Sequence, residues 1–119
     1  MNSVTVSLNE GVTNRHKTTK HEGTFRIDSQ SGALVIEVAG RAVTTFNPSM
    51  WESVKRSGLN TGLLLSRFHV ENAGHGTTAV VAIAADVLQN GALVFLAEDG
   101  TAIAAFGPRA WVSYDRLSS

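Results

Sequence analysis

The sequence lacks cysteine altogether, and it is also poor in charge and in proline. Without cysteine the chain cannot form a disulfide bond, a thiolate nucleophile or a cysteine-ligated metal centre. Charged residues make up 17% of the 119 residues, and ten basic residues balance ten acidic ones. A chain without net charge has no overall field that would attract nucleic acid or an anionic membrane. Either partner would therefore need a local patch.

Export signals and membrane spans are also missing. Residues 1–6 do not combine a basic start with the apolar core of about 7–15 residues that marks a signal peptide. No apolar run approaches the roughly 18 residues of a membrane span. We therefore expect a soluble, cytoplasmic protein. Its length and its 43% apolar content suit one domain with its own hydrophobic core.

An internal repeat organises the chain. Residues 32–51 read GALVIEVAGRAVTTFNPSMW and residues 91–111 read GALVFLAEDGTAIAAFGPRAW, which align with one gap. The aligned pairs include both prolines and both tryptophans of the protein, Pro48/Pro108 and Trp51/Trp111. Such agreement between rare residue types favours duplication over chance. We expect one domain over residues 1–119, with repeats at 1–58 and 62–119 closing a shared core about a pseudo-two-fold axis.

Each repeat shows strand signals followed by a helix signal. Apolar residues alternate with polar ones from Val4 and from Phe68, and turn glycines separate further strands. Residues 79–88 are rich in alanine and fit either a strand or a helix; a strand is favoured because the aligned segment TFRID is strand-like. Asn47-Pro48 and Gly107-Pro108 predict helix starts. The expected fold is therefore β-rich α+β, with two ββββα repeats, barrel-like antiparallel sheets and two short helices.

Residues outside the repeated pattern are the better functional candidates, and His69, Glu71 and His75 form the first group. On a strand, His69 and Glu71 project from the same face, and the glycine-flanked loop after them could return His75. Two imidazoles and one carboxylate suit a divalent metal with open coordination positions. The plainer interpretation, which we favour, is a set of polar residues on an exposed strand face.

The second group lies in residues 14–22, which we expect to form a loop. Arg15, Lys17 and Lys20 give it three fixed positive charges, which could neutralise phosphate or a nucleic-acid backbone. The segment has no aromatic residue for base stacking and no glycine-rich cradle. A solvated loop is therefore the favoured interpretation, and nucleic acid is not the expected partner.

No residue pattern identifies a reaction. The chain has no GxSxG or SxxK nucleophile motif, and no cofactor is expected beyond a possible divalent metal at His69, Glu71 and His75. The leading hypothesis is a non-enzymatic binding or assembly module, a homodimer, that binds a small ligand or a protein at an apolar groove between the repeats. The alternative is a small metal-dependent or acid–base enzyme that uses the His/Glu/His set.

Overall fold

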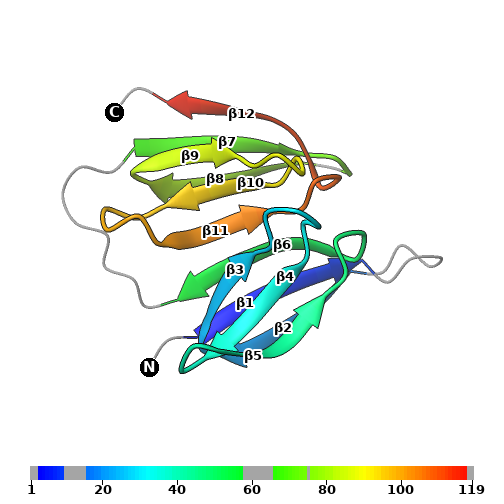
Figure 1. Cartoon of the computed structure of the whole chain (residues 1–119). Coiled ribbons are helices and arrows are strands. Elements are labelled where there is room, and N and C mark those ends of the chain that lie inside the picture. The colour runs from blue at the N-terminus through cyan, green and yellow to red at the C-terminus, as the bar shows by residue number, and fades with distance from the viewer. Residues whose placement is uncertain (1–2, 10–15, 58–65, 75, 118–119) are drawn as a thin grey trace.

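The computed structural model describes residues 3–9, 16–57, 66–74 and 76–117, and every regular element in these ranges is a β-strand (Figure 1). The first half holds β1(Ser3–Asn9), β2(His16–Glu22), β3(Thr24–Ile27), β4(Leu34–Val38), β5(Arg41–Phe46) and β6(Trp51–Ser57). The second half holds β7(Ser66–Asn72), β8(Thr77–Ala82), β9(Ala84–Val87), β10(Leu93–Leu96), β11(Ala102–Phe106) and β12(Trp111–Leu117). The described ranges contain no helix that could cross a membrane.

The two halves pair their strands in the same way. In the first half β1 lies between β2 and β6, and β3, β4 and β5 form an antiparallel meander. In the second half β7 lies between β8 and β12, and β9, β10 and β11 form the matching meander. The register agrees as well, because Leu34 faces Phe46 and Leu93 faces Phe106. The sequence similarity is thus accompanied by equivalent pairing.

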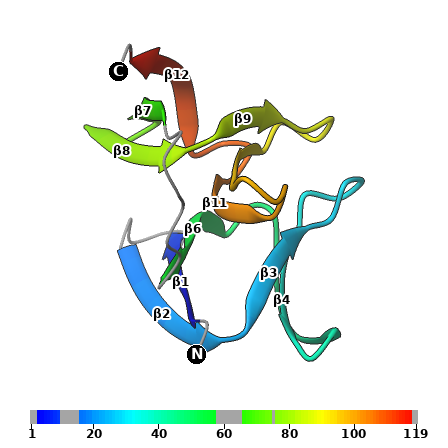
Figure 2. The same ribbon diagram turned by 90° about the vertical axis from the view of Figure 1, so that its left-hand side faces the viewer.

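The halves are joined through two strands, β6 and β11. They pair antiparallel at Lys55 with Ala104, Val54 with Ala105 and Ser53 with Phe106. This contact makes a six-stranded sheet in the order β2-β1-β6-β11-β10-β9, while β12-β7-β8 and β3-β4-β5 remain separate three-stranded sheets. In Figure 2, β7, β8 and β12 lie above, β1 and β2 lie below, and β11 lies between them.

The expected closure about a two-fold axis is wrong. An axis that exchanged the halves would turn the β6–β11 contact into a second contact between β12 and β5. Those two strands lie in different three-stranded sheets, each at the edge of its own. The residue after β11 is Gly107, whose amide donates to the Glu52 carbonyl at 2.8 Å, whereas the residue after β5 is Asn47. Within the described ranges, the halves therefore pair strands at one place only.

The α+β assignment is wrong too, because no helix follows Pro48 or Pro108 in the described chain. The Asn47 side-chain oxygen accepts from the Ser49 amide at 3.0 Å, and the Asn47 carbonyl accepts from the Met50 amide at 2.9 Å. These bonds close a single turn, after which β6 begins at Trp51. Asparagine before proline thus begins a turn here, through the same local hydrogen bonding that would cap a helix.

A β-bulge in β6 and another in β12 give these strands a three-residue side-chain spacing that is also typical of a helix. Leu8 faces Trp51 and Ser7 faces Ser53, so Glu52 is the extra residue of the first bulge. The second half repeats this, because Asn72 faces Trp111 and Glu71 faces Ser113, leaving Val112 extra. A bulge shifts the alternation of side chains by one position. It therefore brings residues three apart, such as Trp51 and Val54, into the core together.

Two further expectations have clear outcomes. Residues 79–88 are extended, as favoured, and belong to β8 and β9, which are separated by Ile83. The expected loop at residues 14–22 is wrong over its described part, because His16–Glu22 forms β2 and pairs with β1 along its length. Its two adjacent threonines, Thr18 and Thr19, fit a strand, since β-branched residues favour extended backbone.

The hydrophobic core has two clusters, one in each half, and both tryptophans contribute to them. Trp51 is 2% exposed, whereas Trp111 is half-buried at the margin of the second cluster. The Asn90 side chain also crosses between the halves, donating to the Asp28 carbonyl at 2.9 Å. The two β-hairpin turns therefore touch, in addition to the β6–β11 contact.

Candidate functional site

A groove runs along the boundary between the two halves. At one end it has a volume of about 670 Å³ and is bordered by the turn before β6, the start of β6, the segment after β7 and the turn before β12. The residues that line this end are Ser7, Pro48, Ser49, Trp51, Glu52, Ser53, Asn72, Ala73, Gly74, Thr78, Phe106, Arg109 and Ala110. Its walls thus come from both repeats.

A second pocket of about 350 Å³ continues the groove between β6 and β8. It is lined by Ser53, Val54, Lys55, Arg56, Thr78, Ala79, Val80, Val81, Ile103, Ala104 and Phe106. Three of these residues, Ser53, Thr78 and Phe106, also line the larger pocket. The two pockets therefore form one groove, which we call the inter-repeat groove.

The β6–β11 contact supplies the floor of the groove. Ile103, Ala104 and Phe106 come from β11 and are no more than 8% exposed. Ala104 and Phe106 are fixed from both sides, because β11 pairs there with β10 as well as with β6. A floor held by backbone pairing on both sides keeps its shape when a ligand enters, which lowers the cost of ordering on binding.

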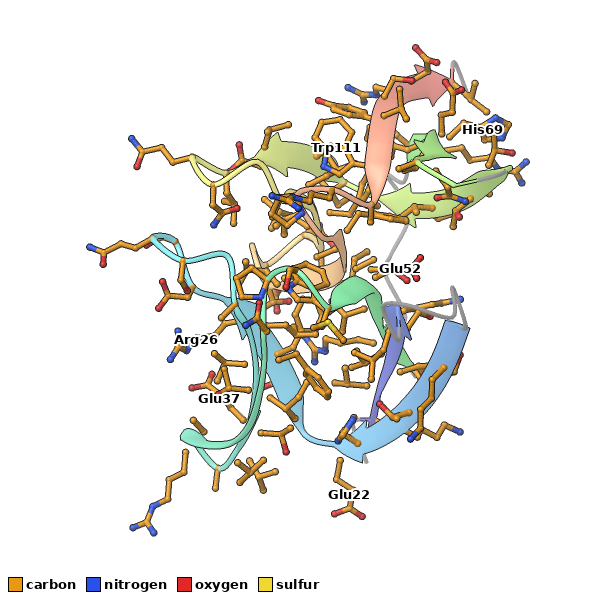
Figure 3. The ribbon with its side chains drawn as sticks, turned by 90° about the vertical axis from the view of Figure 1, so that its right-hand side faces the viewer. Glu22, Arg26, Glu37, Glu52, His69 and Trp111 are labelled. Atoms are coloured by element: carbon orange, nitrogen blue, oxygen red, sulfur yellow. The ribbon has the colours of Figure 1, made fainter. Side chains whose placement is uncertain are left out.

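The charged residues around the groove are mostly basic. Lys55 and Arg56 line the narrower pocket, and Arg109 lines the wider one together with Glu52. In Figure 3, Glu52 projects beside the boundary between the two halves. Three cations and one anion give the groove a local positive character that the chain as a whole does not have.

One edge of the groove is the strand β8. This strand pairs with β7 on one side and with no other described strand. Four consecutive residues of β8, Thr78 to Val81, line the narrower pocket. An edge strand presents unpaired N–H and C=O groups along its free side. The groove therefore has backbone hydrogen-bonding groups as well as side chains along one wall.

The structure places two members of the expected His/Glu/His set. His69 and Glu71 lie on the exposed face of β7, where His69 faces Asp115 of β12 and the Ser113 hydroxyl donates to Glu71 at 3.3 Å. Figure 3 shows His69 at the outer side of the second half, away from Glu52. His75 lies outside the described residues. Within the described ranges, no three His, Cys, Asp or Glu residues are grouped as a metal site.

The basic group is also placed only in part. Lys17 and Lys20 are exposed on β2, and Arg15 lies outside the described residues. Neither lysine lines the inter-repeat groove. The structure thus brings no described member of either predicted group to the inter-repeat groove.

The carboxylates with shifted pKa values stabilise turns. The backbone amides of Ser31 and Gln30 donate to Asp28 at 3.0 and 2.9 Å and hold its pKa below the ordinary value. The hydroxyl of Thr101 donates to Asp99 at 2.6 Å and its amide at 3.0 Å, which lowers the pKa of Asp99 as well. Both lie in turns and neither lines the groove, so neither indicates an acid–base site there.

Sequence reasoning missed the groove residues because they come from segments that only the strand pairing brings together. One signal was present in the alignment of the repeats. Val6 faces Thr19 in the first half and Val70 faces Thr78 in the second, so Lys20, His21 and Glu22 correspond to Ala79, Val80 and Val81. The absence of charge at these positions of the second copy marks β8 as different from β2.

Comparison of the chain with protein-family models, curated proteins and solved structures gives no match, so no relative assigns a role to the groove.

Proposed function

We propose that the protein is a non-enzymatic binding module whose ligand occupies the inter-repeat groove. The continuous groove of about 670 and 350 Å³ carries the proposal, because its walls come from both repeats and its floor is the contact that joins them. Concave sites with a mainly apolar floor and a few polar groups are typical of ligand pockets. Ser53 and Thr78 supply hydroxyls where the two pockets meet.

The one-sided arrangement of the halves supports this function. The two repeats form equivalent sets of strands, yet in the described chain only β6 and β11 pair between the halves, and the groove lies over that pairing. The corresponding edges, β5 and β12, remain apart in the described chain. The groove is therefore specific to the way in which the two repeats were joined. We also propose that two copies of the chain form a homodimer. The surface between the two copies would lie outside the inter-repeat groove.

Occupancy of the groove can be tested by screening small apolar fragments by NMR against the labelled protein. We expect shift changes to gather on groove residues such as Ser53, Thr78 and Phe106. Ser53→Trp fills the point where the two pockets meet and should abolish the binding of these fragments. Ser113→Trp changes the equivalent position of the second half, which does not line the groove, and should leave binding intact. Fragments that bind elsewhere, or that still bind to Ser53→Trp, would refute the proposal.

A further inference from the structure

β8 is an edge strand of the described chain, and it carries no charged residue. Proteins usually guard such edges with charges, since an open edge invites pairing with another chain. The equivalent edge on β2 follows this rule, because it carries Lys20 and Glu22, both exposed. On β8 the same two positions are Ala79 and Val81, and Val81 is 43% exposed. The edge strand β2 therefore carries charges at positions where the corresponding strand β8 has none.

The surroundings of β8 explain how an uncharged edge is tolerated. Across the narrower pocket, β6 presents Lys55, and β11 presents Ile103 and Ala104. The edge therefore opens into a groove of limited width. A long strand edge of another folded protein meets a wall here, whereas a single extended segment needs only the spacing of one paired strand, about 4.8 Å. Lys55, which is exposed, would attract an acidic side chain on that segment.

We infer that the inter-repeat groove binds an extended peptide segment of a partner protein, which pairs with β8 as an added strand. The inference rests on the proposed function and names its ligand class. Main-chain hydrogen bonds to β8 supply affinity, and alternate side chains of the peptide face the floor at Ile103 and Ala104. The preferred segment has β-branched residues at alternate positions and an acidic residue near Lys55.

The test begins with a displayed library of ten-residue peptides that carry Val, Ile or Thr at alternate positions and any residue between them. Peptides enriched on the full-length protein are synthesised, and their affinity is measured by calorimetry. We expect an enrichment of Asp or Glu, and amide shift changes along β8. N-methylation of those alternate peptide residues whose amides face β8 should weaken binding by roughly tenfold or more. N-methylation of the intervening residues should have little effect.

A double variant of the protein tests the edge itself. Ala79→Lys with Val81→Glu transfers the β2 charges to β8 without changing the net charge, and it should weaken peptide binding about tenfold or more. Val43→Lys with Thr45→Glu makes the same change on β5, another exposed edge strand that does not line the groove. This control should bind the peptide as the unmodified protein does. Circular dichroism and the melting temperature verify that both variants fold.

The outcomes separate this inference from the proposed function. Absence of any enriched peptide, or equal tolerance of N-methylation at every position, overturns strand addition. If either result is obtained but apolar fragments still bind in the groove, the proposed function stands and only the peptide as ligand class is wrong. A dimer that forms through β8, seen as a doubled mass that Ala79→Lys with Val81→Glu returns to monomer, would instead identify a second copy as the occupant.

Discussion

Gly107 lies against the main chain of Trp51 so closely that a Cβ atom on it would be 2.5 Å from the Trp51 carbonyl oxygen. The contact lies at the end of the β6–β11 pairing, where the Gly107 amide also donates to the neighbouring Glu52 carbonyl. No side chain can occupy this position unless the backbone moves. The two repeats therefore meet at a position where glycine is required.

Gly107→Ala should destabilise the protein by about 1–3 kcal/mol, the usual cost of an atom forced into a packed site. Equilibrium urea unfolding measures the effect. Gly74→Ala is the matched control, because a Cβ atom there has no neighbour within 4 Å. It should change the free energy of unfolding by no more than about 0.5 kcal/mol. Equal stability of the two variants would show that the contact at Gly107 relaxes freely.

The two tryptophans should differ in their contribution to stability although they make the same hydrogen bond. The Trp51 indole donates to the Gly32 carbonyl at 3.0 Å, and the Trp111 indole donates to the Gly91 carbonyl at 2.9 Å. Trp51→Phe leaves a buried carbonyl unpaired and should cost about 1–3 kcal/mol. Trp111→Phe should cost less, because water reaches the half-buried site. Chemical denaturation of both variants checks the order, which a larger loss for Trp111→Phe would contradict.

Stability should fall in acid partly through Asp28 and Asp99. Both carboxylates have a lowered pKa in the folded protein, so each binds protons more weakly there than in the unfolded chain. Their stabilising contribution is complete above the ordinary aspartate pKa of about 3.9 and is lost as the pH falls through the lower folded value. The measurement is the melting temperature between pH 2 and pH 6, taken in steps of about half a unit.

The double variant Asp28→Asn with Asp99→Asn should show a smaller loss of melting temperature in that range. Asp86→Asn is a suitable control, because Asp86 is an exposed aspartate outside these turns. An unchanged acid profile in the double variant would mean that other carboxylates dominate the transition.

The charges on β2 should keep its edge from pairing with other molecules. Lys20→Thr with Glu22→Val removes two of them and leaves Lys17 as the one fixed charge on an edge that lacks the wall that β6 and β11 provide for β8. We expect faster growth of light scattering on incubation at high protein concentration. Lys55→Thr with Glu37→Val makes the same change in charge away from strand edges and should not accelerate aggregation. Similar rates for both variants would contradict a protective role of β2.

The local features of this fold could be read from the sequence. Alternating apolar residues and turn glycines predicted the strands and hairpins, because side-chain alternation and turn geometry are properties of short segments. The alignment of Gly32 with Gly91 and of Trp51 with Trp111 predicted equivalent contacts, and both indoles indeed donate to the matching glycine carbonyls. The favoured strand assignment at residues 79–88 is confirmed for the same reason, since its aligned segment forms a strand.

The tertiary structure alone decided three features. Residues after Pro48 form a strand because β1 and β11 offer partners on both sides, and a bulge then reproduces the spacing of a helix. The halves meet on one side because a non-local strand pairing requires Gly107, for which the other edge has Asn47. The groove arises from that pairing, which joins residues far apart in the chain. Periodicity and propensity describe each segment by itself, whereas the choice of partner strand depends on which edges the folded halves leave free.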